Sequence, residues 1–237
     1  MGQYYCGTIL NKESFDNKEI KVAKAISPYS VKNGAKLTEH SWVGNWYVKL
    51  YERLLANEYK GYPLVWAGDY AKPKFDKLVY DEAWDFIRSF IANKAKELGL
   101  HPNTDRNNWF KEYYKVDDEG EIIYISENTL DDIIPYEDIE EDTYAFIINY
   151  DKKQFVRIPK DDPDTWTAHP LPLLCADGNG QGGGDYWGKN YTKVGYWAYD
   201  RIGVADELPE DIKTELIITF NEDEPRELND FSFKEIE

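Results

Sequence analysis

The chain has 237 residues, of which 42% are hydrophobic and 16% aromatic, so it is long and apolar enough to bury a full core. It has no apolar run near the ~20 residues of a membrane span and no signal-peptide pattern at its start, which predicts a cytoplasmic protein that does not enter a membrane. Its formal net charge of −17 argues against direct binding to nucleic acid, because phosphate groups are bound by Lys and Arg.

The first half of the chain combines segments typical of strands with two segments of helical periodicity. Apolar residues recur at helical spacing from Val43 to Leu54, and Ser41 is suited to cap the start of that helix. A second periodic segment stops at Gly99, a residue type that favours the left-handed backbone at a helix end. The expected elements are strands at residues 3–10, 20–26 and 62–66 and amphipathic helices at residues 43–57 and 79–98.

After Gly99 the apolar residues recur at every second position, which is typical of strands. Short turns rich in Asp, Lys and Gly separate several of these segments, so we expect neighbouring strands to pair as hairpins. Strands are expected at residues 109–116, 121–126, 143–150, 154–158, 191–204 and 214–220. The whole pattern predicts an α+β fold, with a largely antiparallel mixed sheet covered by the two amphipathic helices, in a single domain of residues 1–237.

Charge is distributed unevenly along the chain. Residues 1–115 contain 18 Lys and Arg against 14 Asp and Glu, whereas twelve carboxylates and no Lys or Arg lie between Asp117 and Asp142. Mutual repulsion makes so acidic a segment either a solvated face or a surface for a cationic partner. We interpret residues 117–142 as an acidic hairpin and loop insertion, and the partner that it would fit is a basic host protein.

Six of the 16 glycines fall between Gly178 and Gly188. Consecutive glycines let backbone N–H groups converge on one point as an anion nest, and nearby polar and aromatic side chains add hydrogen bonds and stacking. Such a site suits a small polar, nucleotide-like ligand. The tripeptide Gly-Asp-Tyr occurs both at residues 68–70 and in this loop, which suggests that further segments contribute. The predicted ligand-binding residues are Glu39, His40, Asn45, Trp66, Asp69, Tyr70, His169, Asn179, Gly182, Gly183, Gly184, Asp185 and Tyr186.

Three known motifs are approximated in the same stretch, and each lacks a required part. The dinucleotide-type pattern at residues 178–183 is followed by no predicted helix, and the P-loop-like residues 183–190 lack the Ser or Thr that binds magnesium. The calcium-loop-like stretch from Asp177 ends on Gly188 where a bidentate Glu is needed. We therefore expect no metal at this site, and no cofactor is named by the sequence.

Short blocks spread over most of the chain, outside its acidic middle, form a distinctive set. They are Gly2-Gln3-Tyr4-Tyr5, Glu39-His40-Ser41, Val43-Gly44-Asn45, Trp66-Ala67-Gly68-Asp69-Tyr70-Ala71, His169-Pro170-Leu171-Pro172-Leu173-Leu174, Gly178-Asn179-Gly180, Gly182-Gly183-Gly184-Asp185-Tyr186, Val194-Gly195 and Trp197-Ala198. This set resembles an uncharacterised family found in phages and prophages of gut and related bacteria. The resemblance implies an accessory protein of a phage or mobile element, and it assigns no chemistry, cofactor or catalytic residue.

Three functions from different classes remain open. The first is binding of a small polar, nucleotide-like ligand through the glycine-rich loop, with a counter-defence role in the phage context. The second is inhibition of a basic host protein by an acidic surface that mimics nucleic acid. The third is a metal-assisted hydrolase, which is less favoured because its candidate residues match no known ligand spacing. Those candidates are His40, Asp69, His169, Asp177 and Asp185.

Overall fold

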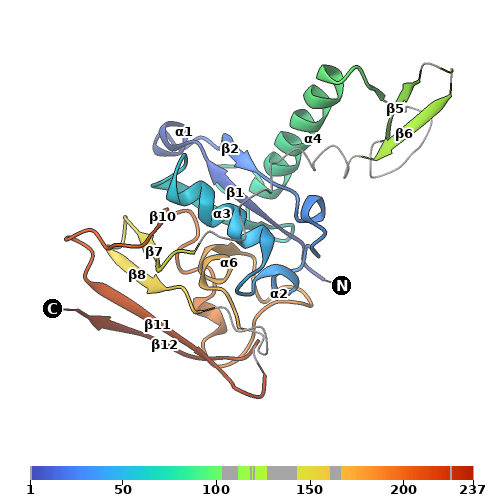
Figure 1. Cartoon of the computed structure of the whole chain (residues 1–237). Coiled ribbons are helices and arrows are strands. Elements are labelled where there is room, and N and C mark those ends of the chain that lie inside the picture. Colours follow the sequence, from blue (N-terminus) through green and yellow to red (C-terminus); the bar gives the residue numbers. More distant parts are fainter. Residues whose placement is uncertain are drawn as a thin grey trace.

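The computed structural model describes residues 2–102, 112–117, 119, 121–126, 143–160, 167–224 and 226–236. Its main feature is a nine-stranded sheet (Figure 1). The strands of this sheet are β1 (Tyr5–Leu10), β2 (Val22–Ala25), β3 (Tyr62–Gly68), β7 (Phe146–Asn149), β8 (Gln154–Arg157), β9 (Ala176–Asp177), β10 (Arg201–Ala205), β11 (Thr214–Phe220) and β12 (Leu228–Glu235). The expected α+β class, with a large mixed sheet, is confirmed.

The order across the sheet is β12-β11-β8-β7-β10-β3-β1-β2, and β9 pairs with β3 outside this path. Neighbours are antiparallel except for β8 with β11 and β3 with β9, which are parallel. The helices are α1 (Lys12–Asp16), α2 (Leu37–His40), α3 (Trp46–Ala56), α4 (Val79–Glu97) and α6 (Pro170–Cys175), with 3-10 turns at Pro28–Val31 and Tyr191–Lys193. Within the described ranges, none of these helices has the length and apolar character needed to cross a membrane.

Strand β1 lies at the centre of the core because both of its faces are covered. Tyr5 and Ile9 pack in the cluster that contains the buried residues of α3, whereas Cys6 packs with the buried face of α4. Side chains alternate between the two faces of a strand, so the two predicted amphipathic helices cover opposite sides of β1. All six residues of the strand are buried as a result.

Helix α3 begins three residues later than its periodicity predicted, and Ser41 is not its cap. The cap is Asn45, whose Oδ1 accepts the N–H of Tyr47 at 2.9 Å. Ser41 instead ends the short helix α2. Ser41 and Asn45 both carry a side-chain oxygen that can cap a helix, so residue type alone does not show which of them is the cap.

The strand expected at residues 191–204 is wrong over most of its length. Only Arg201–Ala205 forms a strand, and the residues before it turn back against α6. The N–H groups of Gly195 and Trp197 donate to the carbonyls of Leu173 and Leu174 at 2.8 and 2.7 Å. Gly195 has a φ of +79°, a left-handed conformation that interrupts any strand.

Several elements were not expected from the sequence, and the longer ones among them are α6 and β12. Helix α6 contains Pro170 and Pro172, which read as turn residues, yet proline is well tolerated in a first helical turn where no N–H partner exists. Strand β12 alternates polar and apolar residues from Asp230 to Lys234, so a strand signal was present in the sequence but was not used for the prediction.

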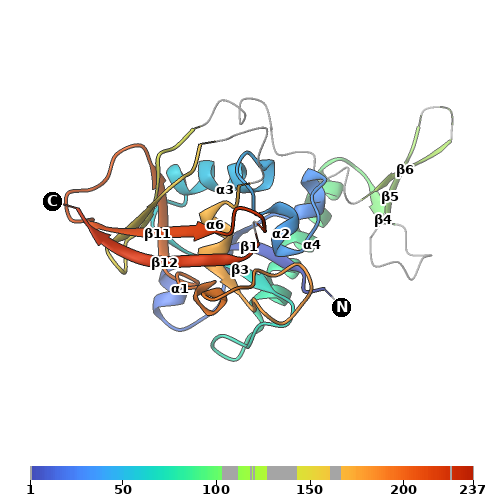
Figure 2. The same cartoon turned by 90° about the horizontal axis from the view of Figure 1, so that it is seen from below.

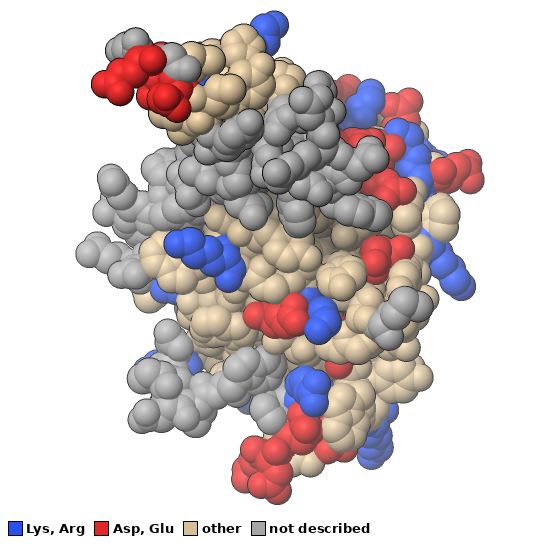
Figure 3. Space-filling model, turned by 90° about the vertical axis from the view of Figure 1, so that its right-hand side faces the viewer, with Lys and Arg blue, Asp and Glu red and all other residues tan. Residues whose placement is uncertain are grey.

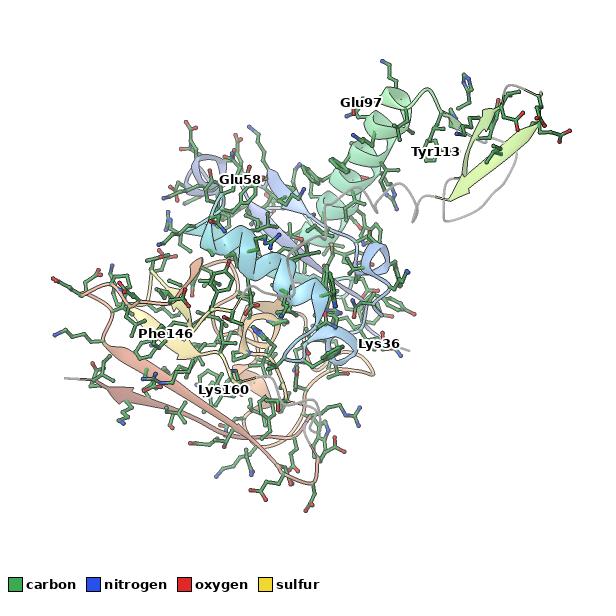
Figure 4. All side chains as sticks on the ribbon, in the orientation of Figure 1. Lys36, Glu58, Glu97, Tyr113, Phe146 and Lys160 are labelled. Atoms are coloured by element: carbon green, nitrogen blue, oxygen red, sulfur yellow. The ribbon has the colours of Figure 1, made fainter. Side chains whose placement is uncertain are left out.

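A separate three-stranded sheet extends from the end of α4. It consists of β4 (His101–Pro102), β5 (Glu112–Val116) and β6 (Ile122–Ser126), in the order β4-β5-β6. Figures 1 and 2 both show its hairpin projecting away from the large sheet. Tyr113, labelled with Glu97 in Figure 4, packs against the buried face of α4 and is 3% exposed. The predicted hairpin is therefore present, whereas most of the acidic insertion at 117–142 lies outside the described residues.

Candidate functional site

The glycine loop (residues 177–188) is closed around the carboxylate of its own Asp185. Oδ2 of Asp185 accepts hydrogen bonds from the N–H groups of Gly180 at 2.7 Å, Gln181 at 3.0 Å and Gly182 at 3.1 Å. Three neighbouring N–H groups that converge on one oxygen form the type of nest that glycines favour. Because Asp185 is 8% exposed, an external anion would have to displace a buried carboxylate to reach these groups.

The other oxygen of Asp185 joins the loop to β1. The hydroxyl of Tyr5 donates to Oδ1 at 2.8 Å. Burial, and then the negative charge of Asp185, raises the pKa of Tyr5 far above its usual range, so the phenol stays protonated and remains a donor. Gln3 adds another link between the loop and the start of β1. When its amide is oriented to suit its neighbours, the amide nitrogen donates to the Gly178 carbonyl and the amide oxygen accepts the N–H of Tyr70 at 3.2 Å.

Three further contacts hold the second half of the loop. The Asn179 side chain bonds in both directions with the backbone of Tyr186, at 3.0 and 2.9 Å. The buried hydroxyl of Tyr186 pairs with Oγ of Ser41 at 2.7 Å. The carbonyl of Gly184 accepts both the N–H and the hydroxyl of Thr38, at 3.0 and 2.8 Å.

Gly182 and Gly183 lie directly against the start of the chain. Gly183 forms an isolated parallel bridge with Gly2. A Cβ atom at Gly182 would lie 2.3 Å from the backbone nitrogen of Gln3, so the close approach of the two backbones requires glycine. The glycines of this loop therefore allow close packing between two backbone segments.

His40 and Trp66 meet in the core. Nδ1 of His40 lies 2.9 Å from the Gly34 carbonyl, and Nε2 accepts the indole N–H of Trp66 at 3.1 Å. Burial lowers the pKa of His40 to about 4, although the Gly34 hydrogen bond and the charge of Glu39 act in the opposite direction. The imidazole is thus neutral at neutral pH, with both ring nitrogens engaged by the protein.

The other predicted residues of these segments also bond within the protein. The Glu39 carboxylate contacts the N–H of Lys36 at 3.0 Å and its ammonium group at 3.1 Å. Asn45 caps α3. Asp69 accepts the N–H of Tyr4 at 3.1 Å, and burial raises the pKa of Asp69 above its usual value. The structure thus gathers most of the predicted residues around the first strand, and their role toward a ligand stays a prediction.

His169 faces a different place, a cleft of about 730 Å³ between α3 and the segments beside β7 and β8. Its Nε2 lies 3.0 Å from Oε1 of Glu52, and its Nδ1 accepts the N–H of Leu171 at 3.2 Å. Because Nδ1 is an acceptor, the ring proton is on Nε2, and Nε2 donates a hydrogen bond to Glu52. His169 and Glu52 are only 2% and 5% exposed, so a carboxyl–imidazole pair forms the buried floor of the cleft.

A fixed guanidinium group lies at the rim of this cleft. Nε of Arg157 donates to Oε1 of Glu215 at 2.6 Å, and the guanidinium carbon lies 5.2 Å from the ring centre of Phe146. No described residue bonds to its two terminal nitrogens. Lys160 also lines the cleft, and Figure 4 shows it on the same side of the molecule as Phe146.

The cleft and the glycine loop are connected through Ser41. The backbone N–H of His169 donates to the Ser41 carbonyl at 3.0 Å, while the Ser41 hydroxyl pairs with Tyr186. Of the predicted residues, His169 is thus the one whose side chain reaches the cleft and whose backbone reaches the loop network.

Sequence reasoning missed Glu52 and Arg157. Glu52 lies within α3 among residues that are buried, and a carboxylate inside an apolar helix face is a signal that helical periodicity supplies. Arg157 ends strand β8 and carries no comparable signal, because its role depends on Glu215 and Phe146 from other strands.

A second, shallower hollow of about 560 Å³ lies on the glycine loop itself. Its rim includes Trp187 and Tyr191, each 45% exposed, and Arg226. Nε of Arg226 pairs with Glu224 at 3.1 Å. This hollow is the place where a ligand held by the glycine loop would lie.

The residues proposed for a metal-assisted hydrolase are used in separate contacts. Asp177 accepts the Tyr199 hydroxyl at 2.6 Å, and Asp185, His40 and His169 have the partners described above. In the parts of the chain that the structure describes, no three His, Cys, Asp or Glu side chains are grouped so that they could hold a metal ion.

Comparison with known proteins gives no match, since no family model fits the chain and neither a curated protein nor a solved structure is significantly similar to it.

Replacing Asp185 by Asn turns one acceptor oxygen into an NH₂ donor, so either the three loop N–H groups or the Tyr5 hydroxyl would face a donor. We expect Asp185→Asn to lower the free energy of unfolding by about 2–3 kcal/mol, and Tyr5→Phe to lower it by about 1 kcal/mol. Urea denaturation measures both. In the double variant the Asn amide can turn toward the vacated hydroxyl site, so its loss should be smaller than the sum of the two; additive losses would show that the groups do not interact.

The lowered pKa of His40 makes stability depend on pH. Between about 6.5, the ordinary value, and about 4, the unfolded chain binds a proton that the folded protein does not. The free energy of unfolding therefore falls as pH decreases through this window, by up to about 1.4 kcal/mol per pH unit.

His40→Gln offers a donor and an acceptor but does not titrate. We expect the variant to be less stable than the natural protein at pH 7, and the difference to shrink at pH 5. Urea denaturation at the two pH values measures this difference. An equal difference at both values would mean that His40 is not held neutral by burial.

Proposed function

We propose that this protein binds a small polar ligand with a carboxylate or phosphate group, and that the ligand occupies the cleft over Glu52 and His169. The observation that carries this proposal is the buried Glu52–His169 pair at the floor of a cleft of about 730 Å³. That volume lies within the ~300–1,000 Å³ range of small-molecule sites and is large enough for a nucleotide.

The floor of the cleft supports binding of a polar group. Burying a carboxylate is costly unless it is paired, and removing Glu52 or His169 separately would leave the other without its partner. His169 orients Glu52 by donating to Oε1, which leaves Oε2 as an acceptor for a ligand hydroxyl or N–H group. The ring itself has both nitrogens engaged, so this geometry supports binding more than acid–base catalysis.

The rim of the cleft supports binding of an anion. Glu215 and the ring of Phe146 fix the Arg157 side chain, and the terminal guanidinium nitrogens can form two parallel hydrogen bonds to a carboxylate or phosphate. Lys160 adds a second positive charge. The carboxylates of Glu52 and Asp206 also line the cleft, so the proposal rests on the directional donors of Arg157 and not on an excess of positive charge.

The glycine loop is the alternative place for the same class of ligand, and the hollow beside Trp187 and Arg226 favours it. Its nest, however, holds Asp185, which lessens its capacity for a second anion. A nucleotide-like ligand and a counter-defence role in a phage or mobile element remain part of the proposal. Such a role would consist of sequestering the ligand.

The two other functions have less support. For a nucleic-acid mimic, the carboxylates from Asp131 to Asp142 lie outside the described residues. On the face shown in Figure 3, the described Lys and Arg residues are interspersed with Asp and Glu, so those residues form no continuous acidic surface there. A hydrolase has no metal-binding group among the described residues.

A thermal-shift screen with inorganic phosphate, nucleotides, cyclic nucleotides and small dicarboxylates tests the proposal. A compound present at about 100 times its dissociation constant adds about 2.7 kcal/mol to the free energy of unfolding. We expect Arg157→Lys, which keeps the charge but loses the planar fork, to weaken binding of such a compound by roughly 10- to 100-fold.

Arg226→Lys is the matched control, because it makes the same change at the rim of the glycine-loop hollow. We expect it to leave the affinity unchanged. If Arg226→Lys weakens binding and Arg157→Lys does not, the ligand lies at the glycine loop and the cleft proposal is wrong. If no compound in the screen raises the melting temperature, the ligand class is wrong.

A further inference from the structure

Strand β12 is the last strand of the large sheet. Trp187 and Asn190 bond to Leu228 and Asn229 at its start, and its outer edge is open from Asp230 onward. Strand β12 pairs with β11 on one side, and no other strand in the described ranges pairs with it (Figures 1 and 2). The strand is eight residues long and contains no proline. Its irregularity lies at one end, opposite Thr219 and Phe220, so the stretch from Asp230 to Glu235 is regular. A long regular edge of this kind is a template for another strand.

The same edge leaves aromatic side chains partly uncovered. Phe231 and Phe233 lie opposite Ile218 and Leu216 of β11, on the face that continues the core. Both rings contact Tyr196, with centroid distances of 5.5 and 5.9 Å. Phe233 is nevertheless 48% exposed, because no strand lies beyond β12 in the described structure to cover it.

We propose that a second copy of this chain docks on β12, so that the two β12 strands pair antiparallel with Ser232 opposite Ser232. In this register Asp230 of each copy lies opposite Lys234 of the other. Phe231 of each copy likewise lies opposite Phe233 of the other. The pairing thus creates two opposite-charge pairs and two aromatic pairs, which are the cross-strand contacts that stabilise antiparallel sheets.

The two-fold symmetry is consistent with the order of residues in the strand. An axis perpendicular to the sheet keeps each face continuous across the interface, so the four Phe rings share the core face and the Asp–Lys pairs share the opposite face. Shifting the register by two residues in either direction places Ser232 opposite Lys234 or Asp230, and both charge pairs are lost. The charges therefore specify one register.

Sedimentation velocity over a range from low micromolar to near-millimolar concentration tests this dimer. We expect the natural protein to pass from monomer to dimer in this range. Asp230→Lys and Lys234→Asp each replace two attractive pairs by two repulsive ones, and we expect each variant alone to dimerise at least about tenfold more weakly. A natural protein that stays monomeric at every concentration would overturn the proposal.

Mixing the two variants separates a specific interface from a folding defect. In a mixed dimer both cross-strand charge pairs again join a lysine of one copy to an aspartate of the other. The Asp230→Lys chain should therefore associate with the Lys234→Asp chain as a heterodimer, and the doubly substituted chain should dimerise with itself. Glu58→Lys, a charge reversal at an exposed residue that Figure 4 labels far from β12, is the control and should not change the association. Failure of the mixture to associate, or equal weakening by Glu58→Lys, would show that the Asp230–Lys234 pairs do not form.

Discussion

The hydrogen bonds of the Asp185 carboxylate fix the glycine loop against strand β1, and the arrangement of the segments around the loop depends on them. This carboxylate accepts three backbone N–H groups of the glycine loop through one oxygen and the Tyr5 hydroxyl through the other. Tyr5 belongs to the strand that both principal helices cover, so the loop is anchored to the middle of the core. A buried carboxylate is tolerated there because charge-assisted hydrogen bonds replace its hydration.

This constraint separates the structural and the ligand-binding parts of the molecule. The polar groups of Asp185 and Asn179 are bonded within the loop, and Gly182 has no side chain because another backbone lies against it. The loop therefore presents few unpaired groups to a ligand. The cleft differs in this respect, since Glu52 and Arg157 each keep polar atoms that face no described partner. Ser41 links the two regions, so the loop network also positions the backbone of His169 at the cleft floor.

Local signals predicted much of the fold and little of the site. Periodicity located α3 and α4, and a turn with Gly120 located the β5–β6 hairpin, because these elements depend on neighbours in sequence. Strand β12 was missed although its residues alternate between polar and apolar from Asp230 to Lys234, and α6 was missed since its prolines also suit turns. The glycines indicated an anion nest, but the sequence did not show that the carboxylate of Asp185 fills it, because that depends on how the loop folds back on itself. Glu52, Arg157 and His169 come from distant segments, so no local pattern brings them together.

Native-state hydrogen exchange at the amides of Gly180, Gln181 and Gly182 tests the role of Asp185 most directly. If the Asp185 carboxylate is hydrogen-bonded to these three N–H groups in the folded protein, their amides exchange only when the core opens. Their protection should then approach that of the β1 amides. The amide of Lys12 serves as the unprotected reference, because this exposed residue begins α1, where an N–H group has no partner within the helix. Exchange of the three loop amides as fast as that of Lys12 would show that the nest is open to solvent, and the division between a structural loop and a ligand-binding cleft would be wrong.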